Sequence, residues 1–442
     1  MDSSSTAPSV DLANGANGHA GPKGVNGSSS SSPSHTRVPK RLYSLSTPPS
    51  LSDFKTLCSQ STSREMYPLA SAVVSNIPIY DLPDEDGVDD AVLDALQDEW
   101  HHILLSGPGV MVLRNFMPDR ALLERVNDVF AAIIADEAAA AAGEGRSKGD
   151  HFAASGTNAR IWNSFQKHAT RDPASFVRYY ANRYLAAVCA AWLGPAYQVT
   201  AQVNIVRPGG RPQVPHRDYH LGFQTGEACA RYPAATQTAT QFLTLQGAVA
   251  HTDMPLASGP TRFLPFSQQF AAGFLAYRRP EFQALFEARW VSCPLHMGDA
   301  VFFNPALVHA AGENQTRDVH RSANLLQVSS AFGKTMESVD TLAMISRCWD
   351  EVRRMYDEDT RGGERKGAGA GADLLTGTRV EAVLNAMGNG YPFPTNLDRR
   401  PPAPGGMAPE SETDVLRRGL LEGWNRDQVV SAITAIRTDS MP

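Results

Sequence analysis

Cysteine is scarce in this chain, and no stretch is apolar enough to cross a bilayer. Five cysteines are spread over 442 residues, with no two of them close together. Their odd number and wide spacing argue against a disulfide framework or a zinc knuckle and fit a reducing compartment. The longest apolar stretch is residues 185–194, about half of the roughly 20 residues that a transmembrane helix needs. We therefore predict no membrane partner.

The chain also lacks an excess of basic residues. Forty Lys and Arg against 46 Asp and Glu give a formal net charge of −6, and no basic stripe stands out. A protein whose main partner is nucleic acid or an anionic membrane normally carries such a stripe. The first residues have neither the basic nor the apolar part of a secretory signal. These absences predict a cytoplasmic protein without a nucleic-acid partner, and they leave its oligomeric state open.

What the sequence does contain is a globular composition. The hydrophobic fraction is 42% and the charged fraction 19%, so a sizeable core is available. Residues 1–60 differ, because they hold 15 serines and few large apolar side chains. Such a segment cannot bury enough surface to offset its ordering entropy. We therefore predict a disordered tail over 1–62, a folded domain over 63–350 and a helical C-terminal extension with a Gly-rich break over 351–442.

Apolar periodicity changes along the folded part. Helical spacing is followed by short apolar runs between Pro and Gly turns, which are typical of a sandwich or barrel rather than of alternating βαβ units. The fold class is therefore mainly β with flanking helices. The predicted helices are 89–105, 121–135, 175–193 and 414–436, and the predicted strands are 110–113, 202–206, 242–249, 290–293, 300–303 and 322–328.

A candidate metal motif lies in residues 214–220, VPHRDYH. If this segment is extended, His216 and Asp218 point to the same face, because strand side chains alternate. With one more histidine from a distant strand they would form a two-histidine, one-carboxylate face. That face leaves three positions open on non-haem Fe(II), enough for a bidentate co-substrate and O₂. A second such pair, His251 and Asp253, is interpreted as a polar strand end, with metal ligation as the alternative.

The third ligand and an arginine follow downstream. His309 lies after the buried strand 300–303, and Arg321 begins the next long apolar run. A hairpin would place both at one mouth of the fold. There the imidazole could bind the metal, and the guanidinium could take the far carboxylate of a dicarboxylate co-substrate through two parallel hydrogen bonds. Arg317, in the intervening turn, is the alternative partner; Arg321 is favoured because a strand would hold it rigidly.

At this point the chain resembles the phytanoyl-CoA dioxygenase-like branch of the Fe(II)/2-oxoglutarate oxygenases. The resemblance covers about residues 109–332 and depends on three motifs in the expected order. They are PHRDYH at 215–220, GPTRFLP at 259–265 and the segment from His309 to Arg321. One departure is that the family's Pro-Gly-Ser-His is replaced here by PFSQ at 265–268.

The resemblance implies a fold, a site and a reaction. The core would be a double-stranded β-helix, or jelly roll, with helical N- and C-terminal additions. His216, Asp218 and His309 would bind Fe(II), and Arg321 would bind 2-oxoglutarate. Together with O₂, this centre would oxidise a small organic substrate, with hydroxylation as the commonest outcome, and release succinate and CO₂. Gln202 and Asn204 alternate along one strand and are candidates for binding the near carboxylate of 2-oxoglutarate.

Two other functions stay open at this point. One is a cupin-like metal enzyme that does not use 2-oxoglutarate, and the other is a non-catalytic binding protein on the same fold. No motif selects the primary substrate. Residues 149–152 and 160–163 combine polar and aromatic side chains, and we regard them as weaker candidates for substrate contact.

Overall fold

A computed structural model describes residues 38–85, 88–143, 158–361 and 375–442. The chain divides into two units, 1–40 and 41–442. All helices and strands of the described residues belong to the second unit. The predicted contact candidates at 149–152 and most of the predicted tail lie outside the described residues.

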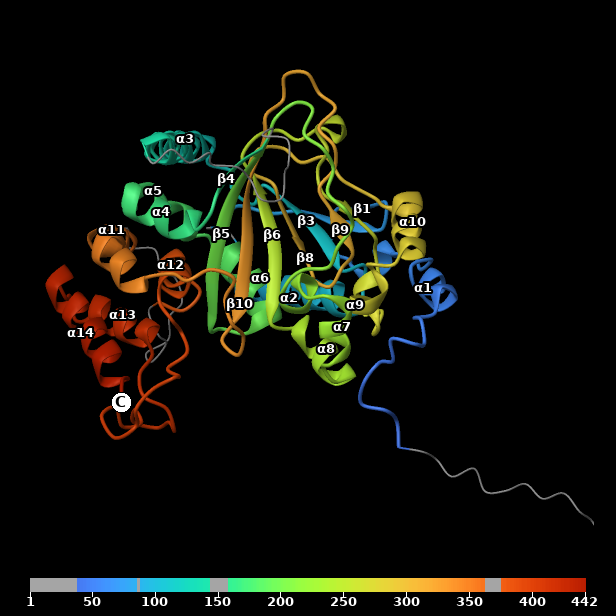
Figure 1. The fold of residues 1–442 in the computed structure, drawn as a ribbon. Helices are drawn as coiled ribbons and strands as arrows, with labels where there is room; N and C mark the ends of the chain where they lie inside the picture. The colour runs from blue at the N-terminus through green and yellow to red at the C-terminus, as the bar shows by residue number, and fades with distance from the viewer. Residues whose placement is uncertain (1–37, 86–87, 144–157, 362–374) are drawn as a thin grey trace, which may run out of the picture. The chain divides into compact units, whose positions relative to one another are not determined.

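An eight-stranded mixed sheet forms the centre of the second unit (Figure 1). Its neighbouring strands pair antiparallel, apart from the parallel pair β2–β3. In spatial order the strands are β1 (Ala72–Val74), β2 (Ile77–Asp81), β3 (Val110–Arg114), β8 (Ala300–Phe303), β6 (Thr244–Ala250), β10 (Arg321–Ser330), β5 (Tyr197–Val206) and β4 (Asn158–Ile161).

A second, shorter ladder lies across a cavity from this sheet. It consists of β7 (Arg262–Phe263) paired antiparallel with β9 (His309–Ala310). Single backbone bridges extend it, joining His216 to His309 and Phe263 to Val291. Residues of both layers line one cavity of about 490 Å³. The two layers are consistent with the jelly-roll-like core that the resemblance implies.

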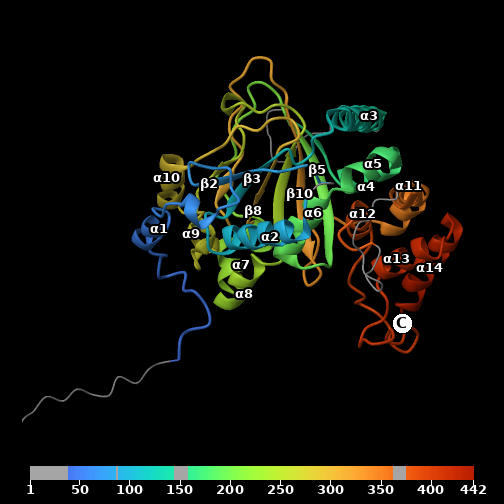
Figure 2. The same cartoon turned by 180° about the vertical axis from the view of Figure 1, so that it is seen from behind.

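Helices surround the sheets. Figures 1 and 2 show α2 and α6 across one face of the large sheet, α3–α5 and α11–α14 near its β5 side, and α1, α9 and α10 near β9. In the parts of the chain that the structure describes, no helix combines the length and the apolar character needed to cross a membrane. The helices are α1 (Leu51–Leu57), α2 (Asp90–Leu105), α3 (Arg120–Gly143), α4 (Ser164–Arg171), α5 (Pro173–Tyr180), α6 (Arg183–Leu193), α7 (Gly226–Ala230), α8 (Ala234–Thr240), α9 (Gly273–Ala276), α10 (Pro280–Arg289), α11 (Thr341–Arg361), α12 (Arg379–Met387), α13 (Glu412–Leu421) and α14 (Arg426–Asp439).

The two faces of the large sheet have different partners. On β10, Leu326 and Val328 belong to the main core with the helices. Ala323 and Leu325 pack instead with a second apolar cluster that includes Val301 and lines the cavity. Because strand side chains alternate, each strand of the large sheet supplies side chains to the helical core on one face and to the cavity on the other. The large sheet therefore separates the helical core from the cavity.

Most predicted elements are present, with corrections. The helix at 89–105 is α2, capped by the Asp89 side chain on Ala91 N–H, and the strand at 300–303 is β8. The predicted helix 175–193 is wrong as a single element, because α5 ends at Tyr180 and Asn182 caps α6. The predicted last helix 414–436 is likewise two helices, α13 and α14. Residues 290–293 contribute only a one-residue bridge at Val291.

The predicted disordered tail is too long. Helix α1 lies inside it, with the Ser50 side chain as its N-cap. Phe54 is 2% exposed, and its ring centroid is 5.1 Å from those of both Phe270 and Phe282. One buried aromatic side chain thus anchors a segment that composition alone had assigned to the tail.

Candidate metal centre

The two histidines of the predicted site are brought together by backbone pairing. His216 and His309 exchange both N–H···O=C hydrogen bonds, at 2.9 and 3.0 Å. Facing residues of an antiparallel pair project to the same side, and the ring centroids are 4.5 Å apart. The short ladder therefore places two imidazoles side by side from segments far apart in the sequence.

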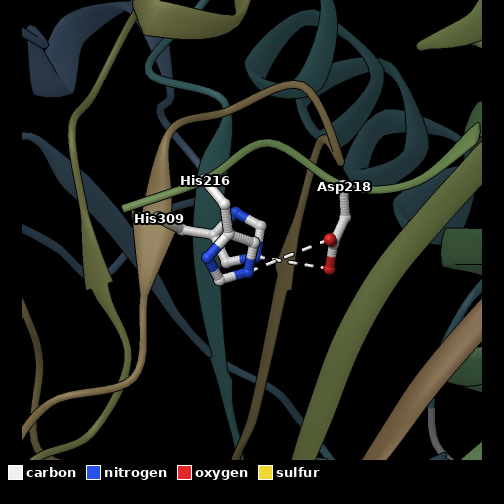
Figure 3. A group of neighbouring side chains, drawn as sticks. All are labelled: His216, Asp218 and His309. Carbon is white, nitrogen blue, oxygen red and sulfur yellow. Dashed lines mark ion pairs between the residues drawn. The ribbon is translucent and has the colours of Figure 1, made fainter. Parts of the chain in front are cut away.

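Asp218 completes the group two residues after His216. Its backbone N–H donates to the Pro305 carbonyl at 2.9 Å, which holds the segment extended. One carboxylate oxygen lies 3.8 Å from His216 Nε2, and the other lies 3.7 Å from His309 Nε2 (Figure 3). The Gln246 amide donates to the carboxylate at 2.8 Å. All three predicted ligand side chains thus converge on one point.

Hydrogen bonds at the far side of each ring fix the imidazoles. His216 Nδ1 lies 2.8 Å from the Val214 carbonyl, and His309 Nδ1 lies 2.8 Å from the Leu307 carbonyl. A carbonyl only accepts, so Nδ1 carries the proton in both rings and the Nε2 lone pair is free. This is the arrangement that outer hydrogen bonds impose on metal-binding histidines.

The electrostatics favour the charge states that a metal needs. Burial lowers the pKa of His216, which keeps the ring neutral. Burial raises the pKa of Asp218, but the neighbouring His216 and His309 rings and the hydrogen bond from Gln246 outweigh it and hold this pKa well below its usual range. Two neutral imidazoles and one carboxylate are the donors that a non-haem Fe(II) face requires. The three candidate ligand atoms lie within 4.8 Å of one another, so the donor set fits such a metal.

Arg321 begins β10 and lies in the same cavity. It is 7% exposed, and one terminal nitrogen donates to the carbonyls of Ser258 and Gly312, at 3.1 and 3.4 Å. No carboxylate pairs with it among the described residues, and burial lowers its pKa to about 10. Arg317 is exposed and does not line the cavity. A buried guanidinium without an acidic partner suits an anionic ligand.

Gln202 and Asn204 also line this cavity, from β5. Gln202 accepts a hydrogen bond from Arg160 of β4 at 2.8 Å. The side-chain oxygen of Asn204 is buried and has no hydrogen-bond partner in the described residues. The two amides therefore stand where predicted, and that of Asn204 has an unused acceptor.

The predicted hairpin between His309 and Arg321 is wrong. His309 is in β9 of the short ladder, whereas Arg321 begins β10 of the large sheet. The chain crosses from one layer to the other between them, and the two residues meet because both layers line the cavity.

The rival pair has other partners. The His251 ring is fully buried between Tyr179 OH at 2.9 Å and the Asn127 side chain at 2.7 Å. Asp253 accepts a hydrogen bond from the Met297 N–H. Neither residue lines the cavity, so the interpretation as a polar strand end agrees with the structure.

Two features were missed from the sequence. Gln246, on β6, hydrogen-bonds the proposed ligand Asp218, and only the alternation of β6 could have indicated it.

Phe266 stands where the family has glycine and adopts φ +68°, the left-handed region that favours glycine. Gln268, in place of the family histidine, is buried and donates to the Gly107 carbonyl at 2.9 Å. The segment PFSQ thus still contains one residue in the conformation that glycine favours.

Fold and site together define the class of the protein, an Fe(II)- and 2-oxoglutarate-dependent dioxygenase with O₂ as its second co-substrate. Residues 105–323 match the model of the phytanoyl-CoA dioxygenase family, PhyH. This match contains His216, Asp218, His309 and Arg321. Residues 105–323 therefore form a domain of the phytanoyl-CoA dioxygenase family, as the sequence motifs predicted.

Other comparisons give weak likenesses. The epimerase SnoN, solved with Fe³⁺, alpha ketoglutarate and nogalamycin RO, is 18% identical over 55% of this chain and 85% of its own, with a TM-score of 0.37. EctD from S. alaskensis, solved with 2-oxoglutarate and 5-hydroxyectoine, is 16% identical over 52% of this chain and 74% of its own, with a TM-score of 0.36. A search of curated proteins finds no match.

Proposed function

We propose that this dioxygenase hydroxylates a C–H bond of a small organic substrate and converts 2-oxoglutarate to succinate and CO₂. Fe(II) with 2-oxoglutarate and O₂ would supply the oxidation, with one oxygen atom entering succinate and the other entering the product. The observation that carries this proposal is the convergence of His216, Asp218 and His309 in a cavity that also holds the buried Arg321.

In this proposal the three ligand side chains hold the metal on one face. The Val214 and Leu307 carbonyls keep the Nε2 atoms of His216 and His309 unprotonated. Gln246 orients the Asp218 carboxylate through its hydrogen bond at 2.8 Å. These contacts fix the orientation of the ligand side chains, as hydrogen bonds behind metal ligands do.

Arg321 would bind the far carboxylate of 2-oxoglutarate. Its remaining donor nitrogens have no hydrogen-bond partner in the described parts of the chain, so two of them can meet a carboxylate in parallel. Gln202 and Asn204 would contact the near carboxylate through their amide N–H groups. Asn204 lies opposite Ala323 on β10, two positions from Arg321, which places it within the same part of the cavity.

The cavity also limits the substrate. Its volume of about 490 Å³ lies in the ordinary range for small-molecule sites, roughly 300–1,000 Å³. Apolar side chains such as Val301, Phe303 and Leu325 form much of the wall, and they would exclude water from the oxidised carbon. A small organic molecule fits these walls.

Several finer features belong to the same proposal. We propose that the two layers are the halves of a double-stranded β-helix and that 63–350 form the catalytic domain, against which α1 packs from the N-terminal side. Residues 351–442 would be its helical extension, which α11 joins to the domain as one continuous helix. Cytoplasmic location and the lack of nucleic-acid and membrane partners stay predictions from charge and cysteine content.

The test is an anaerobic titration of the Fe(II)-loaded protein with 2-oxoglutarate. We expect a metal-to-ligand charge-transfer band that saturates with the co-substrate, and succinate release when O₂ and a substrate from a metabolite library are supplied. The His216→Ala variant is the control and should give neither signal. The rival pair predicts the opposite, with metal lost in His251→Ala and retained in His216→Ala.

The same titration separates the alternatives. A cupin-like enzyme would bind the metal but show no band with 2-oxoglutarate, and a non-catalytic binding protein would bind no metal. Arg321 speaks against the first, because it presents a buried cation to the cavity. Either negative result would overturn the proposed function.

A further inference from the structure

Arg217 stands between the two proposed ligands of the motif, yet it has no place in the chemistry described so far. It is 2% exposed, and its guanidinium carbon lies 5.4 Å from the centre of the Phe274 ring. Because extended backbone alternates, its side chain leaves on the side opposite to His216 and Asp218. There it enters the region of the apolar cluster that includes Phe54 and Phe274.

This buried cation is costly. Among the described residues no carboxylate pairs with Arg217, and its Nε has no hydrogen-bond partner. Apolar side chains of similar volume often replace buried charges with no loss of stability. Stability of the fold is therefore a poor reason for an arginine at this position.

The hydrogen bonds of Arg217 provide a better reason. Its guanidinium donates to the Ser267 carbonyl and to the Phe270 carbonyl, the latter at 3.3 Å. The Ser267 hydroxyl accepts from the Val308 N–H at 2.8 Å, and Val308 precedes His309. One serine thus connects the segment of the first two ligands with the segment of the third.

Glycine at position 273 makes room for this contact. A Cβ there would lie 1.8 Å from the guanidinium carbon of Arg217, so any larger residue must displace the guanidinium. The opposite edge of the motif is tied separately, by the backbone pair between His216 and His309 and by Asp218 N–H on Pro305. Arg217 therefore gives the ligand-bearing segment a second anchor.

We propose that Arg217 is a positioning residue which, through Ser267, sets the spacing between the His216–Asp218 segment and His309 and thereby the metal affinity of the centre. This inference rests on the proposed metal site.

The experiment measures Co(II) binding to the full-length apoprotein by competition with a chelator, together with thermal unfolding of the apoprotein. Arg217→Met keeps length and removes the hydrogen bonds that one terminal nitrogen donates to Ser267 and Phe270. Arg217→Lys keeps the charge but replaces the planar guanidinium by a compact ammonium. Gly273→Ala displaces the guanidinium without removing it. We expect Arg217→Met to raise the Co(II) Kd about 10- to 100-fold, as loss of outer-shell partners does. Arg217→Lys should be intermediate, and Gly273→Ala should resemble Arg217→Met.

Two matched controls accompany these variants. Arg400→Met removes a guanidinium that also donates to backbone, at Glu410, but in the C-terminal segment. Gly226→Ala adds a methyl group where no atom lies within 4 Å. Both should bind Co(II) as the wild type does, and the apoprotein of Arg217→Met should unfold no earlier than that of Arg400→Met.

The outcomes are distinguishable. If the wild type binds no Co(II), or if His216→Ala binds it equally well, the proposed metal site fails. If the wild type binds and Arg217→Met binds within threefold of it, only the positioning role fails. Should Arg217→Met not fold, Gly273→Ala and Arg217→Lys decide by the same threefold criterion.

Discussion

Replacing Arg321 by methionine is the sharpest test of the co-substrate site. Arg321 is 7% exposed, and within the described residues its guanidinium is hydrogen-bonded only to the Ser258 and Gly312 carbonyls. No carboxylate of the described residues pairs with it, so a bound carboxylate would be its ionic partner. Methionine keeps much of the length and the packing but provides no donor.

The expected loss follows from the burial of this pair. Hydrogen bonds to charged groups contribute about 1.5–3 kcal/mol each, and leaving one partner of a buried pair alone costs about 3–5 kcal/mol. We take about 3–4 kcal/mol for two parallel bonds, which raises the Kd for 2-oxoglutarate roughly 150- to 900-fold. Stability of the apoprotein should not fall, because the substitution removes an unpaired buried charge.

The assay is the anaerobic 2-oxoglutarate titration, with Co(II) affinity and thermal unfolding as parallel measurements. Arg317→Met is the matched control, since Arg317 is exposed and outside the cavity, and its Kd should stay within twofold. The reasoning is refuted if Arg321→Met binds 2-oxoglutarate within threefold of the wild type, or if Arg317→Met loses as much affinity.

Three further predictions concern other parts of the chain. Burial lowers the pKa of both His168 and His251 to about 3, so below pH 6.5 only the unfolded state takes up their protons. Stability should therefore fall from pH 6.5 towards 3, with these two groups contributing about 2.7 kcal/mol per pH unit together; urea melts should show a slope smaller by about 1.4 kcal/mol per pH unit in His251→Asn, and an unchanged slope would contradict this. Phe54→Ala should cost about 3–5 kcal/mol in denaturant unfolding, whereas a loss below 1 kcal/mol would mean that α1 is not anchored. Gln246→Leu should raise the Co(II) Kd about tenfold in the chelator assay, and wild-type affinity would show that its bond to Asp218 has no role.

The local sequence pattern was sufficient to predict a helix or strand whose two ends are marked by residues next to it in the sequence. The helix at 89–105 has a capping aspartate before it and a Gly-Pro-Gly break after it, and β8 is a compact apolar run. Spacing failed where a single polar residue interrupts an apolar pattern. At Asn182 the side chain accepts the Leu185 N–H and starts a new helix, so two helices stand where periodicity indicates one.

The site shows the same limit. Alternation placed His216 and Asp218 on one face, but it could not show that His309 and Arg321 belong to different layers, since that depends on pairing between distant segments. Residues that act through others, such as Gln246 and Arg217, could not be assigned a role from a single sequence. Their roles depend on which backbone or side chain lies opposite, and only tertiary structure determines that.

Most side chains of β10 alternate between the cavity and the helical core, although Leu326 of the core also borders the cavity. Arg321, Ala323, Leu325 and Gln327 look into the cavity, while Asn324 donates to the hydroxyls of Tyr179 and Tyr180 on the helical side. A library randomised at 323, 325 and 327 would thus change the shape of the cavity in which a substrate lies, and the packing of the helical core behind the strand would stay intact. Substrate selectivity and fold stability thus depend on alternate positions of β10, so a library can change the first with little effect on the second.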